Sequence, residues 1–132
     1  MLLYTTLGTN DLTRAVQFYD AIFAVLNQPR LPAWADGWAC WGKDLEAGFS
    51  FCLCPPFDGK VASVGNGTMA SFRATSAAQV RAFHTAGTAN GGADAGAPGT
   101  REAYGPNFYV AYLRDPDGHK LACVYPTYNP IE

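Results

Sequence analysis

The sequence contains two similar halves, and this internal repeat constrains the fold more than any other feature. One alignment of the halves, the strand–helix alignment, places Thr6 on Ser71 and Phe18 on Phe83. A second one, the hairpin alignment, has a slightly longer offset and places Gly48 on Gly118. The change of offset is a change in the length of the loop between a helix and the strands that follow it. Such a repeat predicts two similar units, each with an incomplete core, that bury their apolar faces together.

The first half reads as a strand, a helix and two further strands. Residues 3–9 are expected to form the first strand, and the Asn10–Asp11 pair is expected to cap an amphipathic helix of about four turns. Two aromatic-rich runs, 38–42 and 48–54, then read as paired strands. The Gly-rich, polar stretch 58–67 is the expected linker between the halves.

The second half repeats this order. Residues 68–74 read as a strand, and Ser76 with Gln79 forms a capping box at the start of a helix that ends before the glycines at 91 and 92. The rest is expected to be a loop or frayed strand and two strands joined by an Asp-Pro-Asp-Gly turn, at residues 96–104, 107–114 and 119–125.

Length and charge restrict the function further. A chain of 132 residues predicts one domain, here made of two βαβββ modules at about 1–60 and 67–126 in an α+β fold. The net charge of −2 offers no basic surface for nucleic acid. No apolar run reaches the ~20 residues that cross a bilayer, and no secretory signal is visible at the N-terminus. We therefore expect a cytoplasmic protein that binds neither nucleic acid nor membranes.

The four cysteines are expected to be free thiols buried in strands. No Cys-x-x-Cys spacing accompanies them, and each has apolar or aromatic neighbours in the sequence. They are Cys40, Cys52, Cys54 and Cys123.

Three segments resemble the vicinal oxygen chelate superfamily, which includes glyoxalase I, bleomycin-resistance proteins and extradiol dioxygenases. They are TLGTNDLTRAVQFYDA, GNGTMASFRATSAAQVRAFHTAG and YGPNFYVAYLRDPDGHKLACVY. The Asp-Pro-Asp-Gly hairpin after an aromatic strand is the most specific match. The resemblance implies two βαβββ modules whose curled mixed sheets surround a shared cavity, with the helices outside. It also implies that two copies associate, and the many aromatic residues suit a homodimer.

The same resemblance implies a divalent metal in the cavity, but the ligand positions depart from the family pattern. The positions of the family's two histidines fall on Tyr4 and Met69, and the position of its closing glutamate falls on Ala122. The counterpart of Ala122 in the first module is Cys52. A phenol, a thioether and a methyl group do not replace imidazole and carboxylate donors, so we expect no metal cofactor. Cu(I) on Cys52 and Met69 is the one soft-metal alternative.

Strand alternation selects the side chains that face the expected cavity. The candidate ligand-binding residues selected in this way are Tyr4, Thr6, Cys52, Met69, Ser71, Arg73, Lys120 and Ala122. Tyr104 is added because its Tyr-Gly-Pro segment is expected at the mouth of the cavity. Arg73 would favour an anionic or carbonyl-bearing ligand, or would instead pair with a carboxylate such as Asp117. His119 is expected to cap its turn or face solvent, and His84 to pack on the sheet or face solvent.

Three functions follow from these patterns. The first is metal-free binding of a small apolar or aromatic metabolite or drug, with no catalytic residue. The second is an enzyme, either a metal-dependent lyase or dioxygenase of the glyoxalase type or an acid–base catalyst using Tyr4 or Cys52. The third is a structural or regulatory dimer with a vestigial cavity.

Overall fold

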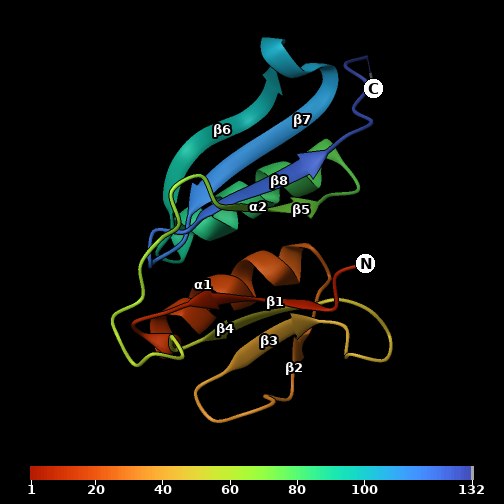
Figure 1. Ribbon diagram of the computed structural model, residues 1–132. Coiled ribbons are helices and arrows are strands. Elements are labelled where there is room, and N and C mark those ends of the chain that lie inside the picture. Colours follow the sequence, from red (N-terminus) through yellow and green to blue (C-terminus); the bar gives the residue numbers. More distant parts are fainter. Residues whose placement is uncertain (132) are drawn as a thin grey trace.

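A computed structural model describes residues 1–131 and contains two four-stranded sheets, each with one helix (Figure 1). The first module consists of β1 (Tyr4–Gly8), α1 (Leu12–Val25), β2 (Arg30–Leu31), β3 (Ala39–Gly42) and β4 (Ser50–Cys54). The second consists of β5 (Met69–Arg73), α2 (Ala77–Ala89), β6 (Ala93–Arg101), the 3₁₀ turn η1 (Glu102–Tyr104), β7 (Gly105–Arg114) and β8 (Lys120–Tyr125). The expected α+β fold of two βαβββ modules is confirmed, and neither sheet closes into a barrel.

The strand register confirms the internal repeat. The sheet orders are β1-β4-β3-β2 and β5-β8-β7-β6, with the first pair parallel in each. Thr6 lies opposite Cys52 in the first sheet, and Ser71 lies opposite Ala122 in the second. The strand–helix alignment relates Thr6 to Ser71, and the hairpin alignment relates Cys52 to Ala122, so both alignments hold in the same strand pair.

Both helices begin at the expected polar caps. The Asp11 carboxylate accepts the backbone N–H of Arg14 at 3.1 Å. The Ser76 hydroxyl accepts the backbone N–H of Gln79 at 3.0 Å, and the Gln79 side chain accepts the N–H of Thr75 at 2.7 Å. These bonds satisfy N–H groups that have no partner within a helix, so each helix start is fixed by its local sequence.

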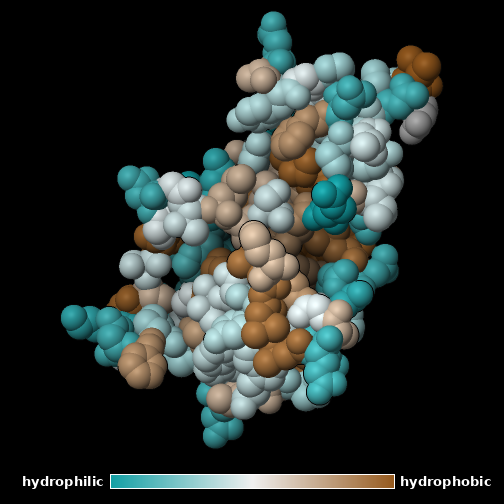
Figure 2. All heavy atoms as spheres, turned by 45° about the vertical axis from the view of Figure 1, so that its right-hand side comes forward, coloured by the Kyte–Doolittle hydropathy of each residue, from teal (hydrophilic) through white to brown (hydrophobic). Residues whose placement is uncertain are grey.

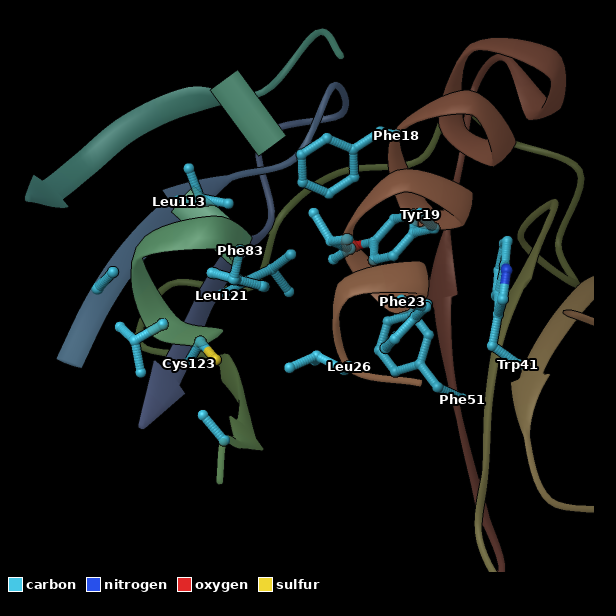
Figure 3. Close-up of a cluster of buried hydrophobic side chains, with 14 of the residues drawn as sticks. Phe18, Tyr19, Phe23, Leu26, Trp41, Phe51, Phe83, Leu113, Leu121 and Cys123 are labelled. Atoms are coloured by element: carbon cyan, nitrogen blue, oxygen red, sulfur yellow. The ribbon is translucent and has the colours of Figure 1, made fainter. Parts of the chain in front are cut away.

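One core joins the two modules through their helices. α1 and α2 pack against each other, and their apolar faces lie against the inner faces of the two sheets (Figure 3). Tyr19, Phe23, Trp41 and Phe51 pack against one another in this core with ring centroids 5.1–5.7 Å apart, and α2 contributes the fully buried Phe83. Burying side chains of this size stabilises the fold by roughly 1.5–3 kcal/mol each. The two modules therefore share a core, as the repeat predicts.

The sheet faces turned away from the helices differ between the two modules. Cys40, Cys52 and Cys54 lie on the outer face of the first sheet, and all four cysteines are free thiols in strands. Their counterparts in the hairpin alignment form a separate apolar cluster on the second sheet, and these are Val110, Ala122 and Val124. The thiols thus occupy positions where the other module has aliphatic side chains, in agreement with the expected buried cysteines, although Cys54 is only half-buried.

The main departure from the predicted elements is β6. The small residues before residue 102 form a nine-residue strand that pairs with β7, where a loop or frayed strand is expected. Its register with β7 shifts three times, so the alternation that normally identifies a strand is broken. None of the helices in residues 1–131 has the length and apolar character needed to span a bilayer.

Candidate functional site

The two sheets leave an unpaired seam between β1 and β5. Each of these strands forms the edge of its own sheet, and no hydrogen bonds of a strand pair join them. A hollow of about 510 Å³, the central hollow, lies along this seam and is lined from both modules. Its apolar lining includes Leu7, Phe49, Phe51, Ala70 and Phe72. The polar side chains in its wall are several threonines and serines, among them Ser71, together with His119 and Lys120.

A buried phenol–carboxylate pair closes one end of the seam, which we call the locked end. The Tyr19 hydroxyl on α1 donates to the Asp115 carboxylate in the β7–β8 turn at 2.6 Å. Burial is the main cause that raises the pKa of both groups. The hydrogen bond from Tyr19 and the charge of His119 partly offset this effect on the pKa of Asp115. A protonated phenol is therefore available to donate across the junction between the modules.

A second carboxylate strengthens the locked end. Asp117, whose side chain is 3% exposed, accepts the Thr9 hydroxyl at 2.6 Å and the Asn10 backbone N–H at 3.0 Å. Arg14 approaches the same carboxylate at 3.4 Å. His119 then donates from Nε2 to the Gly8 carbonyl at 2.7 Å. The β7–β8 turn of the second module is thus fastened to the β1–α1 junction of the first.

The other end of the seam lacks these contacts, and we call it the open end. In the hairpin alignment, Leu45 and Ala47 replace the two turn carboxylates. In the strand–helix alignment, Ala74 and His84 replace Thr9 and Tyr19. The equivalents of the Tyr19–Asp115 and Thr9–Asp117 bonds therefore cannot form. Near this end Gln79 Nε2 instead donates to the Val25 carbonyl of the first module at 2.9 Å.

A hollow of about 730 Å³, the open-end hollow, lies where the β3–β4 turn meets the end of β5. Its floor includes Phe23 and Trp41, and Lys43 and Arg73 also line it. This end lies at the right of Figure 1 and is turned forward in Figure 2, where hydrophobic side chains gather in the middle of the face.

The positions where the resemblance places metal ligands do not form a metal site. Tyr4 and Met69 are each 45% exposed, whereas Ala122 is 1% exposed and has no donor atom. Tyr4 packs edge-on against Trp34 with ring centroids 5.0 Å apart. Within residues 1–131, no group of three or more His, Cys, Asp or Glu side chains could hold a metal ion. A hard dication needs several imidazole or carboxylate donors, so these residues do not fit the family's metal.

The soft-metal alternative also lacks its geometry. The Cys52 thiol is fully buried and hydrogen-bonds with Cys40, its neighbour across β3 and β4. Burial strongly raises the pKa of Cys52, so the thiolate that would bind Cu(I) is disfavoured. Met69 lines the central hollow, and Cys52 is not among the residues that line it.

The nine candidate residues divide among different surfaces. Thr6, Met69, Ser71 and Lys120 line the central hollow. Arg73 lines the open-end hollow, together with Ser71. Tyr4 and Thr6 line a further hollow of about 760 Å³ beside the linker. Cys52 and Ala122 are buried in the sheets, and Tyr104 is 59% exposed on η1, packed against Phe108.

Two sequence expectations are corrected here. Asp117 pairs with Arg14 rather than with Arg73. His119 is 9% exposed and bonds to the first module, so it does not face solvent. The aromatic lining formed by Phe49, Phe51 and Phe72 is not expected from the sequence, because alternation assigns these side chains to the core and says nothing of the seam between two sheets.

Solved structures resemble the whole chain. A glyoxalase/bleomycin resistance protein from Albidiferax ferrireducens is 34% identical, with a TM-score of 0.83 over 95% of this chain and 98% of that one. A glyoxalase-related enzyme from Fulvimarina pelagi is 20% identical, with a TM-score of 0.74 over 99% and 89%. A lactoylglutathione lyase from Agrobacterium tumefaciens is 19% identical, with a TM-score of 0.66 over 95% and 92%.

The last two similarities show the fold alone, whereas the first extends to the sequence. No protein-family model matches the chain, and no curated protein matches it significantly. The chain shares about one-third of its residues with the Albidiferax ferrireducens protein over nearly the whole of both chains, and it has the same fold of two βαβββ modules. It therefore belongs to the glyoxalase/bleomycin resistance protein family of the vicinal oxygen chelate superfamily.

Proposed function

We propose that the protein binds a small, largely apolar or aromatic molecule in the central hollow, without a metal ion. The observation that carries this proposal is the combination of two features at the seam. The hollow has an aromatic lining from both modules, and the family's metal-ligand positions hold a phenol, a thioether and a methyl group. Sequestration of a ligand needs only the first feature, whereas isomerisation or ring cleavage with a metal needs donors that these positions lack.

The size and polarity of the central hollow support a compact ligand. A volume of about 510 Å³ lies within the range of small-molecule sites, ~300–1,000 Å³. The Ser71 hydroxyl and the Lys120 ammonium are polar groups of the second module that line the hollow and could orient a ligand. The Lys120 ammonium also lies 5.1 Å from the centre of the Tyr112 ring, a cation–π contact that holds its side chain at this wall.

Binding of an uncharged fluorescent probe, N-phenyl-1-naphthylamine, tests the proposal. We expect saturable binding of one probe per chain in the central hollow, with unchanged affinity in the presence of EDTA. Thr68 is exposed and lines the central hollow, so Thr68→Trp should reduce the affinity by about tenfold by filling it. Thr13 is exposed on α1 and lines none of these hollows, so Thr13→Trp is the matched control.

Two results would contradict the proposal. One is probe binding that Thr68→Trp leaves unchanged, and the other is turnover of the methylglyoxal–glutathione adduct by the protein loaded with a divalent metal. The homodimer expected from the sequence stays a prediction, which sedimentation velocity tests in the same samples.

A further inference from the structure

We infer that the open-end hollow is a second binding site, and that it takes a small molecule joining a carboxylate to an apolar or aromatic body. This site adjoins the central hollow and shares Phe49, Phe51, Ser71 and Phe72 with its wall, but the inference does not depend on what binds there. It comes from the comparison of the two ends of the seam.

The locked end shows what fills the equivalent space in the same chain. There the β7–β8 turn inserts two carboxylates, Asp115 and Asp117, between the modules. At the open end the β3–β4 turn has Leu45 and Ala47 at these positions, and neither can supply a negative group. The open end therefore has space at those positions, and the turn's own carboxylates, Asp44 and Glu46, do not line the hollow.

The charge at the open end is complementary to such a group. Lys43 on the β3–β4 turn and Arg73 at the end of β5 both line the hollow, and no aspartate or glutamate lines it. Within residues 1–131, neither Lys43 nor Arg73 takes part in a salt bridge. Arg73 stands at the position of Gly8, whose carbonyl accepts the locking bond from His119. Gly8 has no side chain, so the Arg73 guanidinium is a positive group that the open end has at this position and the locked end lacks.

The floor of the hollow determines the rest of the ligand. Phe23, Leu26 and Trp41 are buried side chains of the shared core that reach this hollow, and Phe49 and Phe72 border it from the two modules. Binding an apolar body there removes its surface from water, while Lys43 and Arg73 remain exposed at the rim for the charged group. An aromatic acid fits both the apolar floor and the cationic rim, whereas a simple inorganic anion fits only the rim.

Isothermal titration with 1-naphthoate and its uncharged isostere 1-naphthamide tests the assignment. We expect naphthoate to bind the unaltered protein about tenfold more tightly than naphthamide, which is the usual effect of one charge-assisted contact. Arg73→Gln and Lys43→Gln should each remove most of this preference and leave naphthamide binding within about twofold. Lys60→Gln is the control, because Lys60 is an exposed lysine on the linker that lines none of these hollows.

A sharper variant restores the missing acid. Ala47→Asp places a carboxylate at the position equivalent to Asp117, so it should weaken naphthoate by at least about fivefold and leave naphthamide unchanged. Ala47→Asn has nearly the same shape without the charge and should leave the ratio of the two affinities unchanged. Ala47 is exposed, so neither change should lower the midpoint of unfolding.

Several outcomes would overturn the inference. It is wrong if naphthoate does not bind, if the two isosteres bind equally, or if Ala47→Asp and Ala47→Asn act alike. It is also wrong if Thr68→Trp abolishes naphthoate binding, since the acid would then lie in the central hollow. That last result would leave the proposed function intact.

Discussion

The two ends of the seam between the modules differ although one repeat generates both. At the locked end, a turn with two carboxylates bonds to the helix and loop of the other module. At the open end, the equivalent turn carries Leu45 and Ala47, and a hollow lined by Lys43 and Arg73 remains. One repeated framework can therefore yield a fastening at one end and a binding surface at the other. Several side-chain contacts of the β7–β8 turn fasten the modules at the locked end. Near the open end, Gln79 Nε2 donates to the Val25 carbonyl at 2.9 Å, and the hollow beside it stays accessible.

The largest expected effect comes from removing the buried carboxylate of the locked end. Asp115→Ala leaves the Tyr19 hydroxyl and the backbone N–H groups of Asp117 and His119 without their acceptor. We expect a loss of about 3 kcal/mol in the free energy of unfolding, measured by urea denaturation. Leu45→Ala at the equivalent open-end position, where the side chain is 44% exposed, should cost only about 0.5 kcal/mol. Equal losses would show that the two ends do not differ as described.

A smaller effect is expected from the second carboxylate. Asp117→Asn keeps the shape of the side chain but removes the charge that Thr9, Asn10 and Arg14 face. We expect a loss of about 1.5 kcal/mol in the free energy of unfolding. Ala47→Asn at the equivalent turn position should stay within about 0.5 kcal/mol of the parent protein. A neutral result for Asp117→Asn would mean that Asp115 alone fastens this end.

The pH dependence of stability separates the ends in another way. Burial raises the pKa of Asp115 above its value in the unfolded chain, about 3.9. The folded state therefore holds the Asp115 proton more tightly than the unfolded state does. The stability that this proton contributes is complete below the unfolded-state pKa of Asp115, and it is lost as the pH rises through the folded-state pKa. Relative to Asp115→Asn, the parent protein should lose stability on going from pH 4 to 6, by at most about 1.4 kcal/mol per pH unit. A relative gain over this range would contradict the direction of the shift.

The smallest expected change in stability concerns the cysteines on the sheet face turned away from the helices. Cys52 occupies the position of Ala122, and Cys40 that of Val110. If the thiols serve only as small apolar side chains, Cys52→Ala and Cys40→Val should each change the free energy of unfolding by less than about 1 kcal/mol. Neither should alter probe binding in the central hollow. A loss of binding in either variant would assign the thiols a role that their burial does not suggest.

The fold can be predicted from the sequence to a large extent, because the determinants are local. The two alignments of the repeat, the Asp11 and Ser76 caps and the Asp-Pro-Asp-Gly turn are all visible in short segments, and the strand register agrees with them. β6 is predicted only as a loop or frayed strand, because its small residues and register shifts hide the alternation.

The site is less predictable, because it depends on how two sheets dock. Alternation places Met69 and Ser71 on one face of β5, and it places Phe72 on the other. It does not predict that a hollow along the free edge of β5 receives side chains from both faces. The sequence assigns His119 to its own turn for the same reason, since its partner is Gly8, at the far end of the chain in the first module.

The central claim is that the seam holds a ligand without a metal, and metal stoichiometry tests it most directly. Protein prepared without chelators, incubated with Zn²⁺, Ni²⁺ or Fe²⁺ and then desalted, can be analysed by plasma mass spectrometry. The donor set at Tyr4, Met69 and Ala122 predicts less than about 0.1 ion per chain for each metal. One ion per chain, lost when Met69 is changed to alanine, would contradict the account.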